Sequence, residues 1–139
     1  DLVGIQARVL QAMGMDHALV VYGHDGLDEI SLEGTTLVGE LKDGQVREYE
    51  IHPKDFGLNT AQTNSFKVAN AEESKAIVLD VLNKKSGPAS DIVCLNAGAV
   101  LYVADVAPSI ASGIQMAQAA IASGAARQKL DQFVAATQN

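Results

Sequence analysis

The chain has 139 residues, of which 47% are hydrophobic and 19% are charged, and this composition predicts one globular domain rather than a disordered chain. The formal net charge is −7 and Lys and Arg form no cluster, which argues against a nucleic-acid partner. Asn, Asp and Gly interrupt the apolar runs well before the roughly 20 residues that a membrane-spanning helix requires, so we expect no membrane partner either.

The first predicted element is a helix over residues 1–14, for which Gly14 supplies the C-terminal stop. Apolar residues recur along it at helical spacing: Leu2, Ile5, Val9 and Met13. Because the helix is already under way at residue 1, without a starting Met, we expect the chain to be a piece of a longer protein. The sequence HALVVYG follows at residues 17–23, and a β-branched run that ends at Gly is typical of a buried strand.

The sequence TLVGELKDGQVREYEIH, residues 36–52, predicts a β-hairpin. Asp43 and Gly44 suit a two-residue type I′ turn, in which both central residues need a positive φ angle. With that turn, a pair of opposite charges and an apolar pair face one another across the ladder. The predicted pairs are Lys42 with Gln45, Glu40 with Arg47, and Val38 with Tyr49.

The rest of the chain predicts a loop and four helices. After the loop, residues 52–70, Asn70 caps the first helix, and Glu73 stands three residues later in a capping-box arrangement. The second helix, residues 89–104, is apolar nearly all round, as expected of a central buried helix. The other two occupy residues 109–124 and 125–137. The predicted fold class is therefore α/β, with a strand and a β-hairpin flanked by helices and a mostly helical C-terminal half.

Two adjacent acids, Asp28 and Glu29, follow the predicted strand in the stretch GHDGLDEIS. Open α/β sheets bind ligands beyond the carboxyl ends of their strands, and Mg²⁺ prefers hard oxygen ligands such as carboxylates. Gly23 and Gly26 would let the backbone approach a ligand closely. His24 is either a phosphate-binding or acid–base group or a polar loop residue. The residues alone leave two alternatives for the acids, a metal site or a solvated loop.

Cys94 and Asn96 stand within the apolar run of the second helix. Cys94 is the single cysteine, which excludes an internal disulfide, and we expect a buried, inert thiol in a reducing compartment. Asn96 interrupts the apolar run, and we expect its side chain to bond to backbone rather than to serve as a ligand. No spacing of His and Cys suits a zinc site, and we assign no catalytic residue.

Five segments resemble the C-terminal half of the anthranilate phosphoribosyltransferase family, in order and at suitable separations: DLVGIQARVLQAMG, ALVVYGHDGLDEISLEG, HPKDFGL, LNAGAVLYVA and SGAARQKLDQFV. The most specific of their elements are GHDGLDEIS and PKDFGL. The resemblance covers essentially the whole chain. It implies that residues 1–139 are the C-terminal part of one phosphoribosyltransferase α/β domain, without the N-terminal helical domain and the glycine-rich loop.

The resemblance also implies an activity. The family belongs to tryptophan biosynthesis, and its members are cytoplasmic homodimers that transfer the phosphoribosyl group of phosphoribosyl pyrophosphate to anthranilate and release pyrophosphate. The family's Asp-Glu pair binds Mg²⁺ beside the pyrophosphate and matches Asp28 and Glu29, with Glu29 shared between two ions. Because the glycine-rich loop lies outside this sequence, we expect the chain alone to be inactive.

Other classes of protein remain as alternatives. One is a nucleoside phosphorylase-like enzyme of related fold, against which the stretch GLDEIS argues. Another is a non-catalytic relative that acts as a binding or nucleic-acid-associated protein, against which the net charge of −7 argues. The third is a structural domain whose acidic pair binds nothing.

Overall fold

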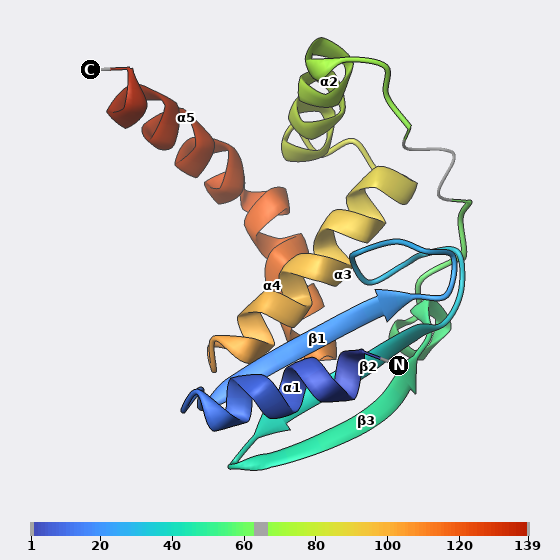
Figure 1. The fold of residues 1–139 in the computed structure, drawn as a ribbon. Coiled ribbons are helices and arrows are strands. Elements are labelled where there is room, and N and C mark those ends of the chain that lie inside the picture. The colour runs from blue at the N-terminus through green and yellow to red at the C-terminus, as the bar shows by residue number, and fades with distance from the viewer. Residues whose placement is uncertain (1, 63–66, 139) are drawn as a thin grey trace.

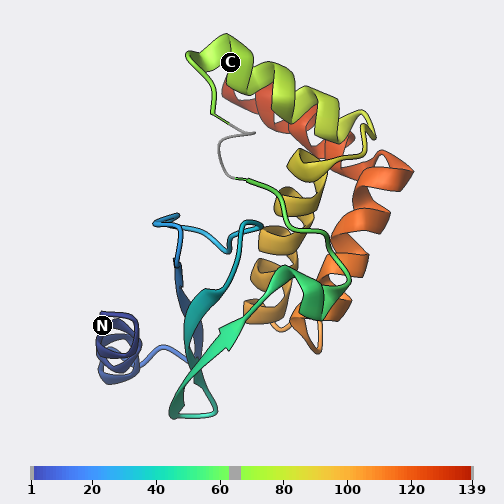
Figure 2. The same ribbon diagram turned by 90° about the vertical axis from the view of Figure 1, so that its right-hand side faces the viewer.

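A three-stranded antiparallel sheet forms the middle layer of the structure, and helices cover both of its faces, as Figure 1 and Figure 2 show. The computed structural model describes residues 2–62 and 67–138. Within them the elements follow in the order α1 (Val3–Ala12), β1 (His17–Gly23), β2 (Thr36–Lys42), β3 (Gln45–Ile51), the 3₁₀ helix η1 (Pro53–Phe56), α2 (Ala71–Leu82), α3 (Pro88–Val103), α4 (Ile110–Ser123) and α5 (Ala125–Thr137). This architecture confirms the predicted α/β class, including the mostly helical C-terminal half.

The hairpin of β2 and β3 has the predicted register. Asp43 and Gly44 have φ angles of 50° and 69°, as the type I′ turn requires. The paired residues are Lys42 with Gln45, Glu40 with Arg47, and Val38 with Tyr49. β1 lies antiparallel on the other side of β2, so Gly23 at the end of β1 pairs with Thr36 at the beginning of β2. The loop that joins these two strands carries the acidic pair.

The two edges of the sheet differ in their side chains. β3 forms one edge and exposes charged residues: Arg47, Glu48 and Glu50. β1 forms the other edge, and no strand among residues 2–62 and 67–138 pairs with its outer side. Its central residues, Leu19 to Val21, are apolar and half-buried. The charged side chains therefore lie on one edge and the apolar ones on the other.

The helix α1 packs on one face of the sheet through its smallest side chains (Figure 2). Val3, Gly4 and Ala7 are buried there. A Cβ on Gly39 would lie 2.9 Å from the carbonyl oxygen of Val3, so the helix backbone lies directly on β2. The apolar residues predicted at helical spacing point away from the sheet and are exposed: Leu2, Ile5, Val9 and Met13. The helix itself is confirmed, but this stripe is not the face that packs.

The main core lies between the other face of the sheet and the helices α3 and α4. Val38 of β2, Leu95 of α3 and Ile114 of α4 are almost fully buried in it. The prediction that the α3 segment is buried all round is wrong for one side of the helix, where Val93 and Val100 are exposed. The sheet and α4 cover only part of its circumference, so apolar residues outside that part stay in contact with solvent.

The helices α3 and α4 meet at a pair of glycines. A Cβ on Gly98 would lie 2.5 Å from the backbone nitrogen of Ile114. A Cβ on Gly113 would collide with the carbonyl group of Gly98. The two helix backbones are therefore in direct contact, and neither glycine position has room for a side chain.

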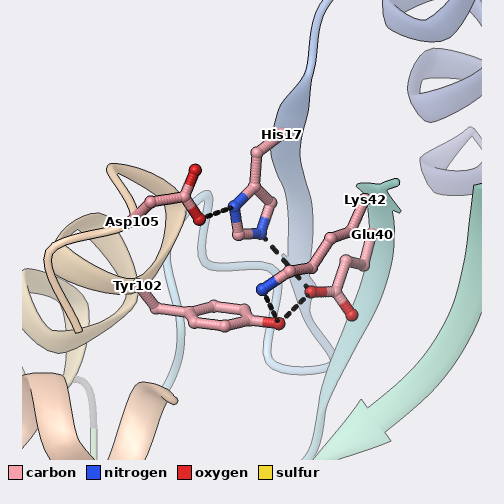
Figure 3. Close-up of polar contacts among 5 residues, drawn as sticks. All are labelled: His17, Glu40, Lys42, Tyr102 and Asp105. Carbon is pink, nitrogen blue, oxygen red and sulfur yellow. Dashed lines mark hydrogen bonds and ion pairs between the residues drawn. The ribbon is translucent and has the colours of Figure 1, made fainter. Parts of the chain in front are cut away.

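A cluster of polar side chains fastens the C-terminal end of α3 to β1 and β2 (Figure 3). Its members, which we call the polar cluster, are His17, Glu40, Lys42, Tyr102 and Asp105. The Tyr102 hydroxyl donates to Oε1 of Glu40 at 2.6 Å and accepts from Nζ of Lys42 at 3.3 Å. Nδ1 of His17 lies 3.1 Å from Oδ1 of Asp105, and Nε2 lies 3.5 Å from Oε1 of Glu40. Burial, and then the hydrogen bond to Glu40, raise the pKa of Tyr102, so the phenol keeps the proton that it donates.

The helices α2 and α5 project from the body of the molecule (Figure 1). The N–H of Glu73 donates to Oδ1 of Asn70 at 2.9 Å, which confirms the predicted cap. The carboxylate of Glu73 accepts from the N–H of Ala69 rather than that of Asn70. The apolar residues of α5, Leu130, Phe133 and Val134, are not buried.

The predicted loop after the hairpin contains the short helix η1, which sequence reasoning missed. Nδ1 of His52 accepts from the N–H of Lys54 at 3.2 Å and caps it. Positions 63–66 of that loop lie outside the described residues. No helix in the part of the chain that the structure describes is long and apolar enough to cross a membrane.

Candidate metal-binding loop

The loop between β1 and β2 is shaped by its own side chains. Asp25 accepts hydrogen bonds from the N–H of Leu27 at 3.3 Å and from the hydroxyl of Ser31 at 2.8 Å. The N–H of Ser31 donates to Oγ1 of Thr36 at 3.0 Å. These bonds fold residues 25–31 back toward β2, so the side chains of the loop itself define its shape.

Asp28 and Glu29 stand side by side on the exposed part of this loop, beyond the carboxyl end of β1. Gly23 holds the N-terminal flank of the pair, because its N–H donates to the carbonyl oxygen of Leu27 at 3.0 Å. That carbonyl group belongs to the same planar peptide unit as the Cα of Asp28. The hydrogen bond therefore restrains the backbone from which the Asp28 side chain leaves.

Asn96 holds the C-terminal flank of the pair from α3. Its Oδ1 accepts from the N–H of Ile30 at 2.9 Å, and its Nδ2 donates to the carbonyl oxygen of Ile30 at 3.0 Å. Nδ2 also donates to the carbonyl oxygen of Ile92 at 3.1 Å. These bonds confirm the prediction that Asn96 bonds to backbone, and they identify its partner as the residue that follows Glu29.

The carboxylates of Asp28 and Glu29 suit a magnesium ion. Neither has a hydrogen bond or ion pair to any residue in the described ranges. Mg²⁺ is usually held by one or two carboxylates together with water and substrate phosphates. No group of three His, Cys, Asp or Glu side chains within residues 2–62 and 67–138 could hold a metal alone. The donor set fits a Mg²⁺ ion shared with a phosphate-bearing ligand, and it does not fit a closed zinc site.

The three substrate-loop candidates begin the same loop. Gly23 is buried, and a Cβ there would lie 2.5 Å from Oδ1 of Asp25, so a side chain at this position would displace the Asp25 carboxylate. Gly26 is exposed with a φ of 88°, a conformation that favours glycine, and has open space around it. The His24 ring is about half exposed, and its Nε2 lies 3.4 Å from Oε1 of Glu50. Contact of these residues with a substrate stays a prediction.

An apolar groove of about 640 Å³ opens beside the loop, between β1 and α3. Glu29 and Asn96 line it near the loop, and Leu19 and Val100 line its length. One of the two candidate metal ligands therefore borders a concave surface with mainly apolar walls.

Cys94 lies on α3, two residues from Asn96, and does not take part in the site. It is 2% exposed, which confirms the predicted burial, and burial raises the pKa of its thiol. That the thiol is inert stays a prediction.

We expect a maleimide to modify Cys94 in the native protein about a hundredfold more slowly than in urea, because reaction requires local or global unfolding. The rate is measured by mass spectrometry of the peptide that contains Cys94. A Ser123→Cys variant, at an exposed position on α4, provides the fast control. Equal rates for Cys94 in the native and the denatured protein would contradict the prediction.

Sequence reasoning named Gly23 and Asn96 but missed the contacts that frame the loop. The bond from Leu27 to Asp25 follows a recognisable local signal, because an Asp before Gly often bonds to the backbone two residues later. The bond from Ser31 to Thr36 has no such signal. The contact of Asn96 with Ile30 joins positions 66 residues apart, which only the folded chain brings together.

The layered fold and the acidic loop at a strand end define a class of protein. Residues 1–127 match the glycosyl transferase family, a/b domain, and the chain belongs to this family.

Within that class, the chain is similar to the anthranilate phosphoribosyltransferases. Over all 139 residues it is 83% identical to the anthranilate phosphoribosyltransferase of Polynucleobacter asymbioticus, and it spans 41% of that protein's length. The crystal structure of anthranilate phosphoribosyltransferase from Thermus thermophilus matches it with a TM-score of 0.86 at 34% identity, over 96% of this chain and 39% of that one. The resemblance that the sequence motifs carry is therefore confirmed.

Two structures of the Saccharomyces cerevisiae enzyme contain ligands. One is in complex with 4-fluoroanthranilate and matches with a TM-score of 0.75 at 25% identity, over 85% of this chain and 35% of that one. The other is a variant with Mg bound, and it matches with a TM-score of 0.72 at 26% identity, over 84% of this chain and 34% of that one. The yeast enzyme thus binds an anthranilate analogue and Mg.

Proposed function

We propose that this chain is part of an anthranilate phosphoribosyltransferase of tryptophan biosynthesis. The enzyme transfers the phosphoribosyl group of phosphoribosyl pyrophosphate to the amino group of anthranilate and releases pyrophosphate. The observation that carries the proposal is the acidic pair, Asp28 and Glu29, which stands exposed and without a described partner at the end of β1, on a loop restrained at both flanks. The family membership and the 83% identity over the whole chain support it.

In this proposal Asp28 and Glu29 hold Mg²⁺ against the pyrophosphate side of the substrate, with Glu29 shared between two ions. Bound Mg²⁺ supplies stabilisation of the negative charge that gathers on the departing pyrophosphate. The two carboxylates carry no proton to or from the substrate. The hydrogen bonds of Gly23 and Asn96 restrain the backbone on both flanks of the pair, so less backbone order has to be imposed when the substrate binds.

The assembly is also proposed. The chain spans 41% of the length of a relative that it matches, so the remaining walls of the site belong to the rest of the protein, and residues 1–139 are inactive alone. They form the C-terminal part of one α/β domain in a homodimer. A cytoplasmic location agrees with the buried, unpaired Cys94.

The test is an assay of the full-length protein that carries this chain. We expect it to consume anthranilate and to release an equal amount of pyrophosphate when phosphoribosyl pyrophosphate and Mg²⁺ are both present. A chelator should stop the reaction and excess Mg²⁺ should restore it, because the carboxylates alone cannot neutralise the leaving group. The chain of residues 1–139, assayed in parallel, should be inactive. Full-length protein that consumes no anthranilate under these conditions would refute the proposal.

A further inference from the structure

We propose that Asn96 is a positioning residue for the Asp28–Glu29 pair, which sets the place of these carboxylates without touching the ligand that they bind. The inference rests on the proposed function, because it assigns Asn96 a role in the same metal site.

The side-chain amide of Asn96 forms hydrogen bonds with both backbone groups of Ile30. Oδ1 accepts from the N–H of Ile30, and Nδ2 donates to the carbonyl oxygen of Ile30, as the backbone of a paired strand would. The N–H of Ile30 belongs to the same planar peptide unit as the Cα of Glu29. Rotation of that unit would swing the Glu29 side chain, and the bond to Oδ1 opposes this rotation.

Both partners of this contact are themselves fixed. The Ile30 side chain is 2% exposed and belongs to the core. Nδ2 of Asn96 also donates to the carbonyl oxygen of Ile92, one helical turn earlier, which holds the amide in one orientation. Groups that orient metal ligands in this way commonly account for about a 10- to 100-fold difference in metal affinity.

The structure also offers a matched control on the same helix. The polar cluster fastens α3 to the sheet through the 2.6 Å hydrogen bond from Tyr102 to Glu40. It lies at the end of β1 and β2 where His17 pairs with Lys42, whereas the acidic loop leaves the opposite end, where Gly23 pairs with Thr36. A Tyr102→Phe variant should therefore weaken the attachment of α3 to the sheet and leave the hydrogen bonds between Asn96 and Ile30 unaltered.

The experiment compares Asn96→Ala, Asn96→Gln and Tyr102→Phe in the full-length protein. Binding of Mn²⁺ in the presence of pyrophosphate is followed by electron paramagnetic resonance, the Mg²⁺ dependence of the transfer rate is measured in parallel, and urea denaturation reports stability. We expect Asn96→Ala to weaken Mn²⁺ binding about tenfold or more, and Tyr102→Phe to change it by less than about twofold while lowering the urea midpoint. Saturating Mg²⁺ should restore most of the rate of Asn96→Ala.

Asn96→Gln keeps the amide on a longer side chain, so its Mn²⁺ affinity should lie between those of Asn96→Ala and the unsubstituted protein. If Asn96→Ala does not fold, Asn96→Gln takes its place in the comparison. Equal weakening by the Asn96 variants and Tyr102→Phe, or unchanged Mn²⁺ binding in the Asn96 variants, overturns the inference and leaves the proposed function standing. Unchanged Mn²⁺ binding after Asp28→Asn and Glu29→Gln overturns the metal site and this inference with it, whereas the anthranilate assay tests the proposed activity separately.

Discussion

Replacement of Asp28 by Asn and Glu29 by Gln together is expected to lower the rate of phosphoribosyl transfer by about a hundredfold or more at limiting Mg²⁺. The amides keep the shape of the two side chains but lack the negative charge that a hard cation requires. Because the loop is held by Asp25, Ser31 and Asn96 rather than by the acidic pair, the variant should fold normally. The measurement is the steady-state rate of the full-length enzyme as a function of Mg²⁺ concentration.

The matched control for this variant is Glu72→Gln with Glu73→Gln. These are also adjacent, exposed acids, and their replacement changes the net charge by the same amount at the start of α2. Gln accepts hydrogen bonds at the helix cap as Glu does. Loss of two negative charges at the start of α2 should lower the stability of the control slightly, and its rate should stay unchanged. If the Asp28 and Glu29 variant retained both its rate and its Mg²⁺ requirement, the acids would be residues of a solvated loop.

Gly113→Ala is expected to reduce the free energy of unfolding by about 1–3 kcal/mol, although Ala is the better helix former. The added methyl group would meet the carbonyl group of Gly98, and a backbone group in a packed helix can move only if the whole helix moves. The cost of separating α3 from α4 therefore exceeds the gain of about 1 kcal/mol in helix propensity. Urea denaturation of both full-length proteins, at the same protein concentration, measures the difference in the free energy of unfolding.

Gly34→Ala provides the control for this substitution. Gly34 lies in the loop before β2 with no atom within 4 Å of a Cβ placed there, and its φ angle is not positive. The control should be neutral or slightly stabilising, because Ala has fewer conformations to lose than Gly on folding. Equal stability of the Gly113→Ala and Gly34→Ala variants would mean that the contact between α3 and α4 yields without cost.

Local signals in the sequence predicted the elements, and they failed where the partner of a residue is remote. Asp43 and Gly44 specify the hairpin register because the turn alone fixes which residues pair. Asn70 likewise specifies the start of α2, because its side chain bonds to a residue only three positions later. Helical spacing in α1 gave a correct helix, but its stripe of Leu2 and Val9 is exposed, because periodicity does not state which face a sheet will cover.

The contact between α3 and α4 was not predictable. Gly113 in an alanine-rich helix indicates only a lower helix propensity until its contact with Gly98 is known. The candidate site was predicted as a pair, Asp28 and Glu29, and its metal role stays a prediction. What holds the pair could not be read from the chain. Asn96 was correctly expected to bond to backbone, but its target, Ile30, is defined only by the seating of α3 against the sheet.

The two edges of the sheet differ in charge, and this difference affects where a further strand can pair. β3 exposes Arg47, Glu48 and Glu50, and charges along an edge discourage the addition of a foreign strand. β1 has no charged side chain between Ala18 and Tyr22, and its outer backbone groups face no strand in the described ranges. Strand addition is therefore favoured at the β1 edge over the β3 edge. An apolar edge without charges is the kind at which foreign strands pair, so a β1 edge left uncovered would be the more prone of the two to aggregation.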